Sequence, residues 1–557
     1  MPGFVVAAFL VGISVVSVKA SYKVDSSIFD VPGADESDNL LNDILHALDN
    51  SSGEALRSAV ARSLPELEAA LGPMLVSLPQ HTGGKFGPTA VRYVLHRLLM
   101  KKHGWLVKGL DPEGQAWNGS SPASAPLLAR LPTDARAAVQ RKLTGPGLSP
   151  KEVAVLALLL TEQVHQEAVR RLGVVYGRVG LPTRGSTFAV HARRAVELYL
   201  AAYIVGRDPT HANRTVLLND LASMNEVYPP WPHVVDLLRK EIQRQVHSGI
   251  VSFADATEVV HHVSDHFWKW QEPACQAIKE TLVKMEDDGS GRVRLADFYG
   301  KALHEGKWQL SESEVYLRQL GALDDSNPNN VRVIIPNYVQ GASNCLATSE
   351  YLSVCCMSEC ESILEQLEHS LGVAEALPGD VAALVASLPS STVPANRSLS
   401  NVMLHRLNRI AMDNGGRVPL HGRLFAQWLH HAYPRECPFP HLSGTTRPLQ
   451  TDAWVKNTGL DIVATPGAMA HHAGPSPRNR RGRRTSRPLE TTLWSYQEEL
   501  FVPRPSEQPE GWLVLQGAVY AAAAAVVALG CLLGRLARAG QRAAQFARAS
   551  ETKLFDV

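Results

Sequence analysis

Residues Glu286 to Asp297 read Glu-Asp-Asp-Gly-Ser-Gly-Arg-Val-Arg-Leu-Ala-Asp, a run rich in oxygen-bearing side chains. Twelve-residue loops that hold Ca²⁺ take hard oxygen ligands from positions 1, 3, 5, 7 and 12. Here those positions are Glu286, Asp288, Ser290, the carbonyl of Arg292, and Asp297. Position 6 has to turn sharply, and it holds Gly291, because glycine adopts positive φ without strain. The stretch therefore predicts a metal-binding loop.

The flanks of this loop, residues 275–285 and 295–303, carry apolar residues at helical spacing, which predicts an EF-hand. EF-hands usually occur in pairs, and Gly249-Ile-Val-Ser-Phe-Ala-Asp255 repeats the Gly-x-Val-x-apolar-Ala-Asp skeleton 42 residues earlier. The ligand positions of this first copy hold Arg244, Val246 and Ser248, so it cannot bind metal normally. We predict an EF-hand pair over residues 229–308 with a degenerate first loop. A third similar stretch, residues 416–422, is interpreted as a loop that leads into a helix.

The chemistry of the second loop departs from the usual pattern. Position 1 is Glu286 and position 12 is Asp297, where a bidentate Glu is usual. The shorter carboxylate predicts weak Ca²⁺ binding or Mg²⁺ occupancy, and Arg292 and Arg294 add positive charge that opposes a cation. Two interpretations stay open: a weak calcium site, and a structural EF-hand with an empty loop.

Two apolar segments predict a membrane topology. Residues 4–18 are uncharged and predict a signal peptide over residues 1–20, with an uncleaved anchor as the alternative. Residues 512–534 contain no charge over a length that spans a bilayer, with a buried soluble helix as the alternative. Basic residues follow this segment, so we expect a single-pass type I protein of the secretory pathway or cell surface, with a lumenal or extracellular ectodomain and a cytosolic tail over 535–557. Gly530 and Gly534 form a GxxxG pair suited to a homodimer.

Six of the seven cysteines precede the apolar segment, which predicts up to three disulfides in an oxidising compartment. The alternative is a zinc site made by Cys356, Cys360 and either His430 or His431. Glycosylation sequons before the segment, at Asn50, Asn118, Asn213 and Asn396, agree with a glycoprotein.

Composition divides the rest of the chain. Residues 21–228 predict an N-terminal helical domain, 309–465 a Cys-rich helical module, and 466–511 a stalk rich in Pro and Arg. The fold class expected is thus mainly α: a multi-helical ectodomain with an EF-hand pair, a Cys-rich module and one C-terminal transmembrane helix. The net charge of +1 gives no reason to expect nucleic acid as a partner.

Motifs for catalysis are not found: the sequence contains no GxSxG, Walker A, HExxH or CxxC pattern. His262 and His266 lie one helical turn apart and could hold a metal, or simply face solvent. We therefore predict a non-enzymatic, membrane-embedded, calcium-binding protein with a sensing or structural role and an unidentified protein partner. The alternatives are a non-catalytic receptor or scaffold with a metal-free EF-hand, and a hydrolase that uses the His-rich region.

Five segments are similar to a group of EF-hand membrane proteins from dinoflagellate algae. They are VRYVLHRLLMKKHGWLVKGLDP from Val91, GSGRVRLADFY from Gly289, SESEVYLRQLGALDDS from Ser311, IIPNYVQGASNCLATSEYLSVCCMSECE from Ile334, and GRVPLHGRLFAQWLHHAYPRECPFPH from Gly416. The resemblance implies calcium-ion binding through residues 286–297 and a membrane-anchored form, and it implies no substrate or reaction.

Overall fold

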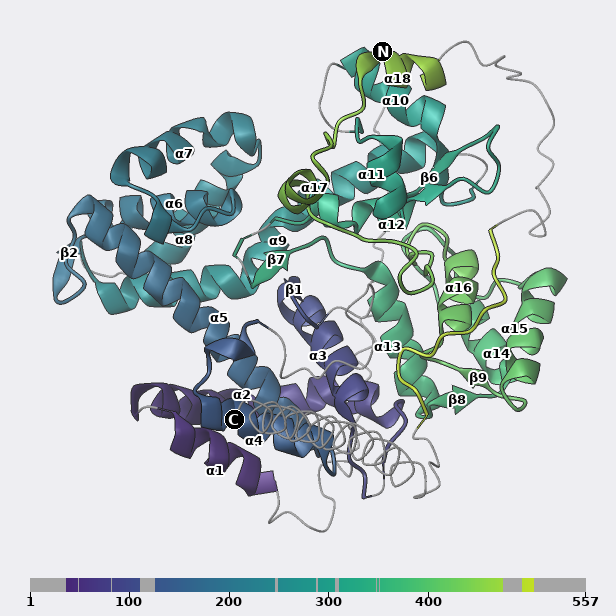
Figure 1. Cartoon of the computed structure of the whole chain (residues 1–557), viewed down its shortest axis with the longest axis horizontal. Coiled ribbons are helices and arrows are strands. Elements are labelled where there is room, and N and C mark those ends of the chain that lie inside the picture. Colours follow the sequence, from purple (N-terminus) through teal and green to yellow (C-terminus); the bar gives the residue numbers. More distant parts are fainter. Residues whose placement is uncertain are drawn as a thin grey trace, which may run out of the picture. The chain divides into compact units, whose positions relative to one another are not determined.

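The computed structural model describes residues 37–48, 50–81, 83–110, 126–245, 249–286, 289–305, 310–346, 348–349, 351–473 and 493–504. The chain divides into two compact units, Met1–Pro503 and Arg504–Val557, and every element named below belongs to the first. Within the described residues there are eighteen α-helices and nine strands of two or three residues, which confirms a mainly helical fold (Figure 1). Their buried apolar side chains form three hydrophobic cores.

The first core is built by the N-terminal helices. Its elements are α1 (Ser37–Ala47), α2 (Asn50–Val76), α3 (Pro88–His103), β1 (Trp105–Val107), η5 (Leu128–Arg130), α4 (Thr133–Thr144), α5 (Pro150–Val179), β2 (Ser186–Phe188), α6 (Ala189–Ile204), η6 (Pro209–His211), α7 (Arg214–Val227), α8 (Trp231–Gln245), β3 (Ile250–Ser252) and the first half of α9 (Phe253–Met285). Helix α5 begins with a capping box between Ser149 and Glu152 and ends at Gly180, whose φ is +76°. Because α8 and α9 contribute side chains, this core continues past the predicted domain boundary at residue 228.

The second core surrounds the C-terminal half of α9. Its elements are β4 (Arg292–Arg294), α10 (Leu295–Glu305), α11 (Glu314–Gln319), β5 (Leu323–Asp324), β6 (Arg332–Ile334), α12 (Ile335–Val339), η7 (Ala342–Asn344), α17 (Thr451–Thr458) and α18 (Pro466–Ala473). Strand β7 (Leu352–Val354) leaves this region and pairs with β1 of the first core.

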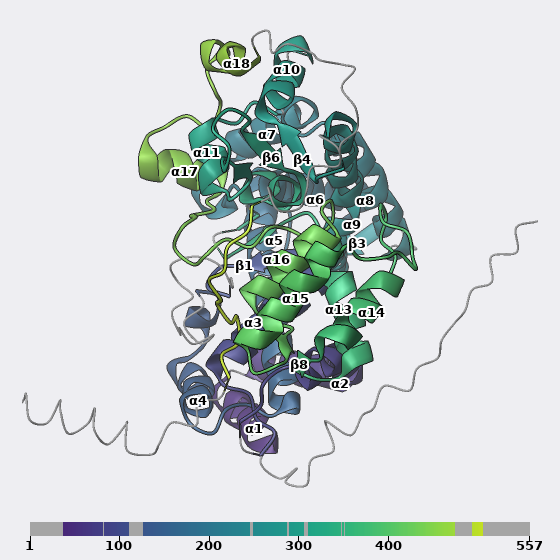
Figure 2. The same cartoon turned by 90° about the vertical axis from the view of Figure 1, so that its right-hand side faces the viewer.

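The third core is a compact group of four helices. Helices α13 (Glu359–Leu371), α14 (Pro378–Ser387), α15 (Asn401–Asp413) and α16 (Arg423–Ala432) pack around β8 (Glu375–Ala376) and β9 (Val418–Pro419). Figure 2 shows these helices, in green, facing the viewer.

Six units in the described residues share one local pattern: a helix, a loop with a short strand, and a second helix, with no more than three residues between the strand and that helix. Their strands are β2, β3, β4, β6, β8 and β9. The units associate in three pairs, each joined by antiparallel strands. Thr187 pairs with Val251 between β2 and β3, Val293 with Val333 between β4 and β6, and Ala376 with Val418 between β8 and β9. One such pair therefore accompanies each hydrophobic core, and the first core also contains the strand pair β1–β7.

The partners in these pairs differ from the predicted ones. The loop before α9 pairs with residues 186–188, and the loop after α9 pairs with residues 332–334. Helix α9 explains why, because its 33 residues span about 50 Å and hold the two loops at opposite ends. The stretch 416–422, interpreted from sequence as a plain loop, contains β9 and belongs to a third pair.

Three disulfides link the chain, as the cysteine count predicts. They join Cys275 to Cys356, Cys345 to Cys355, and Cys360 to Cys437. Cys356 and Cys360 are thus oxidised and cannot be zinc ligands, which removes the alternative metal site proposed from their spacing.

A buried ion cluster joins the first core to the third. Arg97 on α3 is 4% exposed and bonds two carboxylates on α13. Its Nε donates to Glu361 at 2.8 Å, and its Nη2 donates to Glu368 at 2.9 Å. Glu368 is fully buried, so the guanidinium is the cation that compensates its charge.

The fold class needs one correction. Among the described residues, no helix combines the length and the apolar character needed to cross a membrane. The two longest of them, α5 and α9, carry charged residues along their length. The predicted transmembrane helix and the predicted type I membrane localisation are therefore not supported by the described residues. Residues 512–534, with Gly530 and Gly534, lie outside the described residues, as do the predicted signal peptide and tail.

Candidate functional site

The predicted metal loop lies between α9 and α10, with Gly291 at its sharp turn (φ +71°). Glu286 is 4% exposed, and its carboxylate accepts a hydrogen bond from the backbone N–H of Gly291. Arg435, from the segment after α16, donates to Glu286 Oε2 through Nε at 2.7 Å and forms an ion pair through Nη2 at 2.5 Å. This hydrogen bond raises the pKa of Arg435, so its guanidinium stays charged. The first ligand position is therefore already paired with a cation.

The backbone of Pro434 covers this loop directly. A Cβ added to Gly291 would lie 2.0 Å from the carbonyl oxygen of Pro434. Only glycine fits at position 6, both for its φ and for this contact. The segment that carries Arg435 is thus packed onto the loop and is not merely near it.

The other predicted ligands also contact arginines. Asp297 accepts from Arg294 Nε at 2.8 Å. Arg292 is 1% exposed, donates to the carbonyl of Ser290 at 2.9 Å, and bonds the buried Asp324 at 2.8 Å. Asp288 lies outside the described residues. Across the described ranges, no group of three or more His, Cys, Asp or Glu side chains is arranged to hold a metal ion.

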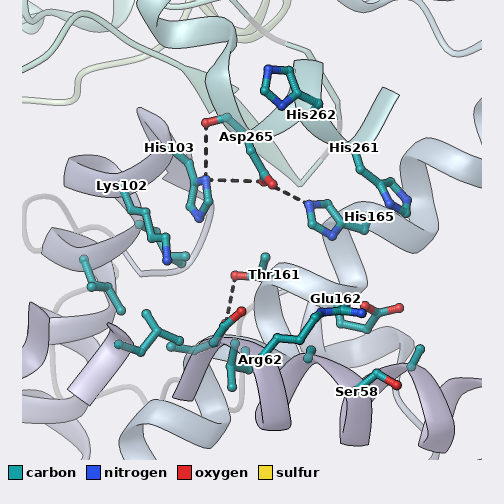
Figure 3. A pocket seen from close by; sticks show the side chains of 18 of the residues that line it. Ser58, Arg62, Lys102, His103, Thr161, Glu162, His165, His261, His262 and Asp265 are labelled. Carbon is teal, nitrogen blue, oxygen red and sulfur yellow. Dashed lines mark hydrogen bonds and ion pairs between the residues drawn. The ribbon is translucent and has the colours of Figure 1, made fainter. Parts of the chain in front are cut away.

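A second site, not predicted as a unit, is a cleft of about 960 Å³ between α2, α3, α5 and α9 (Figure 3). Asp265 on α9 lines the cleft and lies between His103 and His165. Its Oδ1 is 2.9 Å from His165 Nε2 and 3.4 Å from His103 Nδ1. His103 is 6% exposed and His165 is 16% exposed. Three helices thus bring two imidazoles to one carboxylate.

The protonation of this cluster follows from burial and hydrogen bonding. Burial lowers the pKa of His165, but the hydrogen bond and charge of Asp265 outweigh it, so the net pKa is raised. Burial raises the pKa of Asp265, and the hydrogen bond from His165 reverses this, so the net pKa is lowered. Burial lowers the pKa of His103 and of His261 to about 4 each, so these rings are neutral at pH 7.

The predicted pair His262 and His266 is indeed close, with ring centroids 4.3 Å apart. However, His266 Nδ1 lies 3.0 Å from the carbonyl of His262, and His262 Nε2 lies 3.4 Å from Glu241. No hydroxyl or thiol among the described residues is hydrogen-bonded to the rings of His103 or His165, as a nucleophile activated by a base would be.

Comparison with known proteins adds no assignment: the chain matches no family model, no curated protein and no solved structure.

Sequence reasoning missed the residues that matter most in both sites. Arg435 is 149 residues from Glu286, and Asp265 is 100 residues from His165, so no local motif contains either pair. The stretch His261-His-Val-Ser-Asp-His266 drew attention to its histidines, whereas its aspartate makes the central contacts.

Proposed function

We propose that this protein is a non-catalytic receptor or scaffold built on paired EF-hand-like units, in which the loop 286–297 is closed by arginine and holds no metal. The observation that carries the proposal is the pair of contacts from the Arg435 guanidinium to the Glu286 carboxylate. Three disulfides are compatible with a secreted or extracellular protein, and the sequon residues Asn213 and Asn396 are exposed.

Charge and coordination both favour an arginine in this loop over Ca²⁺. Ca²⁺ takes six to eight oxygen ligands in protein sites. The Glu286 carboxylate already accepts hydrogen bonds from Arg435 and from the N–H of Gly291, and the Asp297 carboxylate already accepts one from Arg294. A cation entering the loop has to break both ion pairs and then sit beside two displaced guanidinium groups, at a cost that opposes binding.

The test is a calorimetric titration of the full chain with Ca²⁺, up to about 10 mM, beyond the weakest affinities typical of extracellular modules. We expect no saturable heat from the wild type. Arg435→Gln and Arg294→Gln, each of which frees one carboxylate, should gain measurable binding. Arg409→Gln is the matched control, because Arg409 makes an exposed pair with Asp413 on α15.

A wild-type Kd below 1 mM that Asp297→Asn abolishes would refute the proposal and establish the second candidate, a calcium-binding protein. That candidate follows from the resemblance to EF-hand proteins. One contact favours this candidate. The Glu286 carboxylate accepts a hydrogen bond from the backbone N–H of Gly291, so it is turned into the loop, where a metal ligand at position 1 has to lie. In this case Ca²⁺, or Mg²⁺, would displace Arg435, which is 26% exposed. Repeating the titration with Mg²⁺ separates the two ions.

A further inference from the structure

The cleft around Asp265 has the size and lining of a small-molecule site. Its volume of about 960 Å³ is at the upper end of the range for ligand pockets. Leucines from three helices line it, namely Leu67, Leu98, Leu99 and Leu158, together with alanines of α2 and α5. An apolar body of one or two rings would therefore be desolvated by the cleft.

The charges that face the cleft are unequal. The carboxylates are Glu54 on α2, Glu162 on α5, and Glu258 and Asp265 on α9. The cations are Arg62 on α2 and Lys102 on α3, and His165 on α5 adds a positive charge when it is protonated. Lys102 pairs with Glu66 outside the lining at 3.1 Å, and His165 pairs with Asp265. Glu54 pairs with Arg57, which is also outside the lining, at 3.6 Å. What remains is Glu162 and Glu258 against Arg62, so the free charge of the cleft is negative.

The same negative electrostatic potential acts on the pKa of His165. Besides Asp265, the charges of Glu162 and Glu258 contribute to raising its pKa. A potential that favours a proton on an imidazole also favours another positive group in the same space, and it disfavours an anion.

The polar end of the cleft offers a hydrogen-bond acceptor. Nδ1 of His103 faces two oxygens of Asp265, its carboxylate and its backbone carbonyl, each at 3.4 Å. Nδ1 is therefore the atom that carries the hydrogen, which leaves Nε2 as an acceptor. Figure 3 shows the free side of this ring turned toward the interior of the cleft. His261 also lines the cleft, and its buried Nε2 has no hydrogen-bond partner among the described residues. A ligand that donates hydrogen bonds would satisfy these nitrogens.

We propose that the cleft between α2, α3, α5 and α9 binds a small organic cation, with its apolar body against the leucines and its ammonium group near Glu162, Glu258 and the Nε2 atoms of His103 and His261. This site is distinct from the loop 286–297 and does not depend on whether that loop binds metal.

Three probes with the same phenyl body and different head groups test the proposal by calorimetry on the full chain at pH 7.5. They are 2-phenylethylammonium, 2-phenylethanol and 3-phenylpropionate. We expect the ammonium to bind tightest, the alcohol more weakly and the carboxylate weakest. Equal affinities, a preference for the carboxylate, or no binding of the ammonium at millimolar concentration would each overturn the proposal.

A pair of variants locates the binding and separates it from a folding effect. Glu162→Gln removes one negative charge from the lining and should weaken the ammonium probe by about fivefold, with phenylethanol unchanged. Glu226→Gln, at an exposed position on α7, is the control and should change neither affinity. Equal loss for both probes in Glu162→Gln would mean that the residue only shapes the cleft, which contradicts a cation site. Thermal unfolding of each variant confirms that it is folded.

Discussion

Replacing Arg97 by Met should cost more stability than any other single change at the contact between α3 and α13. The guanidinium is 4% exposed and bonds two carboxylates, of which Glu368 is fully buried and Glu361 is 19% exposed. Methionine keeps much of the side-chain volume but leaves both carboxylates without their cation. Removing one partner of a buried ion pair typically costs about 3 to 5 kcal/mol. We expect a loss in this range in the free energy of unfolding.

The loss should depend on pH in a defined direction. In the native protein, burial raises the pKa of Glu361, although Arg97 opposes the rise. Without Arg97, the pKa of Glu361 should rise further in the folded state, so this state binds more protons than the unfolded one. The free energy of unfolding of the variant then falls as the pH rises through this pKa, and the defect is smallest in acid.

Urea denaturation followed by circular dichroism measures the effect. Lys101→Met is the control, since Lys101 pairs with Glu365 between the same two helices but both side chains are about one third exposed. That change should cost at most about 1 kcal/mol. The double variant Arg97→Met/Glu368→Gln should recover part of the loss, because one buried charge is gone. An Arg97→Met protein within about 1 kcal/mol of the wild type at pH 7 would refute the reasoning.

Three further predictions concern the loop, the disulfides and the cleft. Gly291→Ala should lower the free energy of unfolding, measured by urea denaturation, by at least about 2 kcal/mol, because φ is positive and the new Cβ meets Pro434. The control Gly300→Ala should not lower it in this way, because a Cβ at this position on α10 has open space around it. Replacing Cys275 and Cys356 by serine removes a disulfide between residues 81 positions apart, and it should lower the free energy of unfolding by about 4.5 kcal/mol through loop entropy. Replacing Cys345 and Cys355, which are 10 positions apart, should lower it by about 2.7 kcal/mol in the same assay. His165 should titrate by NMR above its usual pKa of about 6.5, so its contribution to stability is present below that value and is lost as the pH rises through the folded pKa. Asp265→Asn should bring this titration below 6.5; an unchanged midpoint would contradict the assigned cause.

Local patterns predicted the local structure well. Helical spacing after residue 294 predicted α10, which begins at Leu295, and the need for a sharp turn identified Gly291, whose φ is positive. Both features depend on neighbours within one or two turns of chain. The cysteine count predicted three disulfides but left their pairing open, because pairing depends on which loops the fold brings together.

Long-range contacts could not be predicted in this way. The loop 286–297 looks like a cation site by itself, and only the folded chain places Arg435 on Glu286. The loop at residues 180–191 has no acidic ligand, so nothing in its composition indicates a partner for the loop before α9. Gly185 lies two positions before Thr187, as Gly249 lies two positions before Val251. This shared glycine was the one local signal that the two loops pair. The cleft was missed for the same reason, because its residues come from four separate helices.

The disulfide pattern also determines what proteolysis can do to this chain. Cys355 and Cys356 are adjacent, and Cys360 follows within four residues. A cut anywhere between Cys275 and Cys356 leaves the two fragments joined by one bridge, and a cut between Cys360 and Cys437 leaves them joined by another. Between residues 275 and 437, only Met357, Ser358 and Glu359 lie outside both bridged spans. A nicked molecule would therefore run as one band without reductant and as two with it, and it would keep its three cores together after damage to an intervening loop.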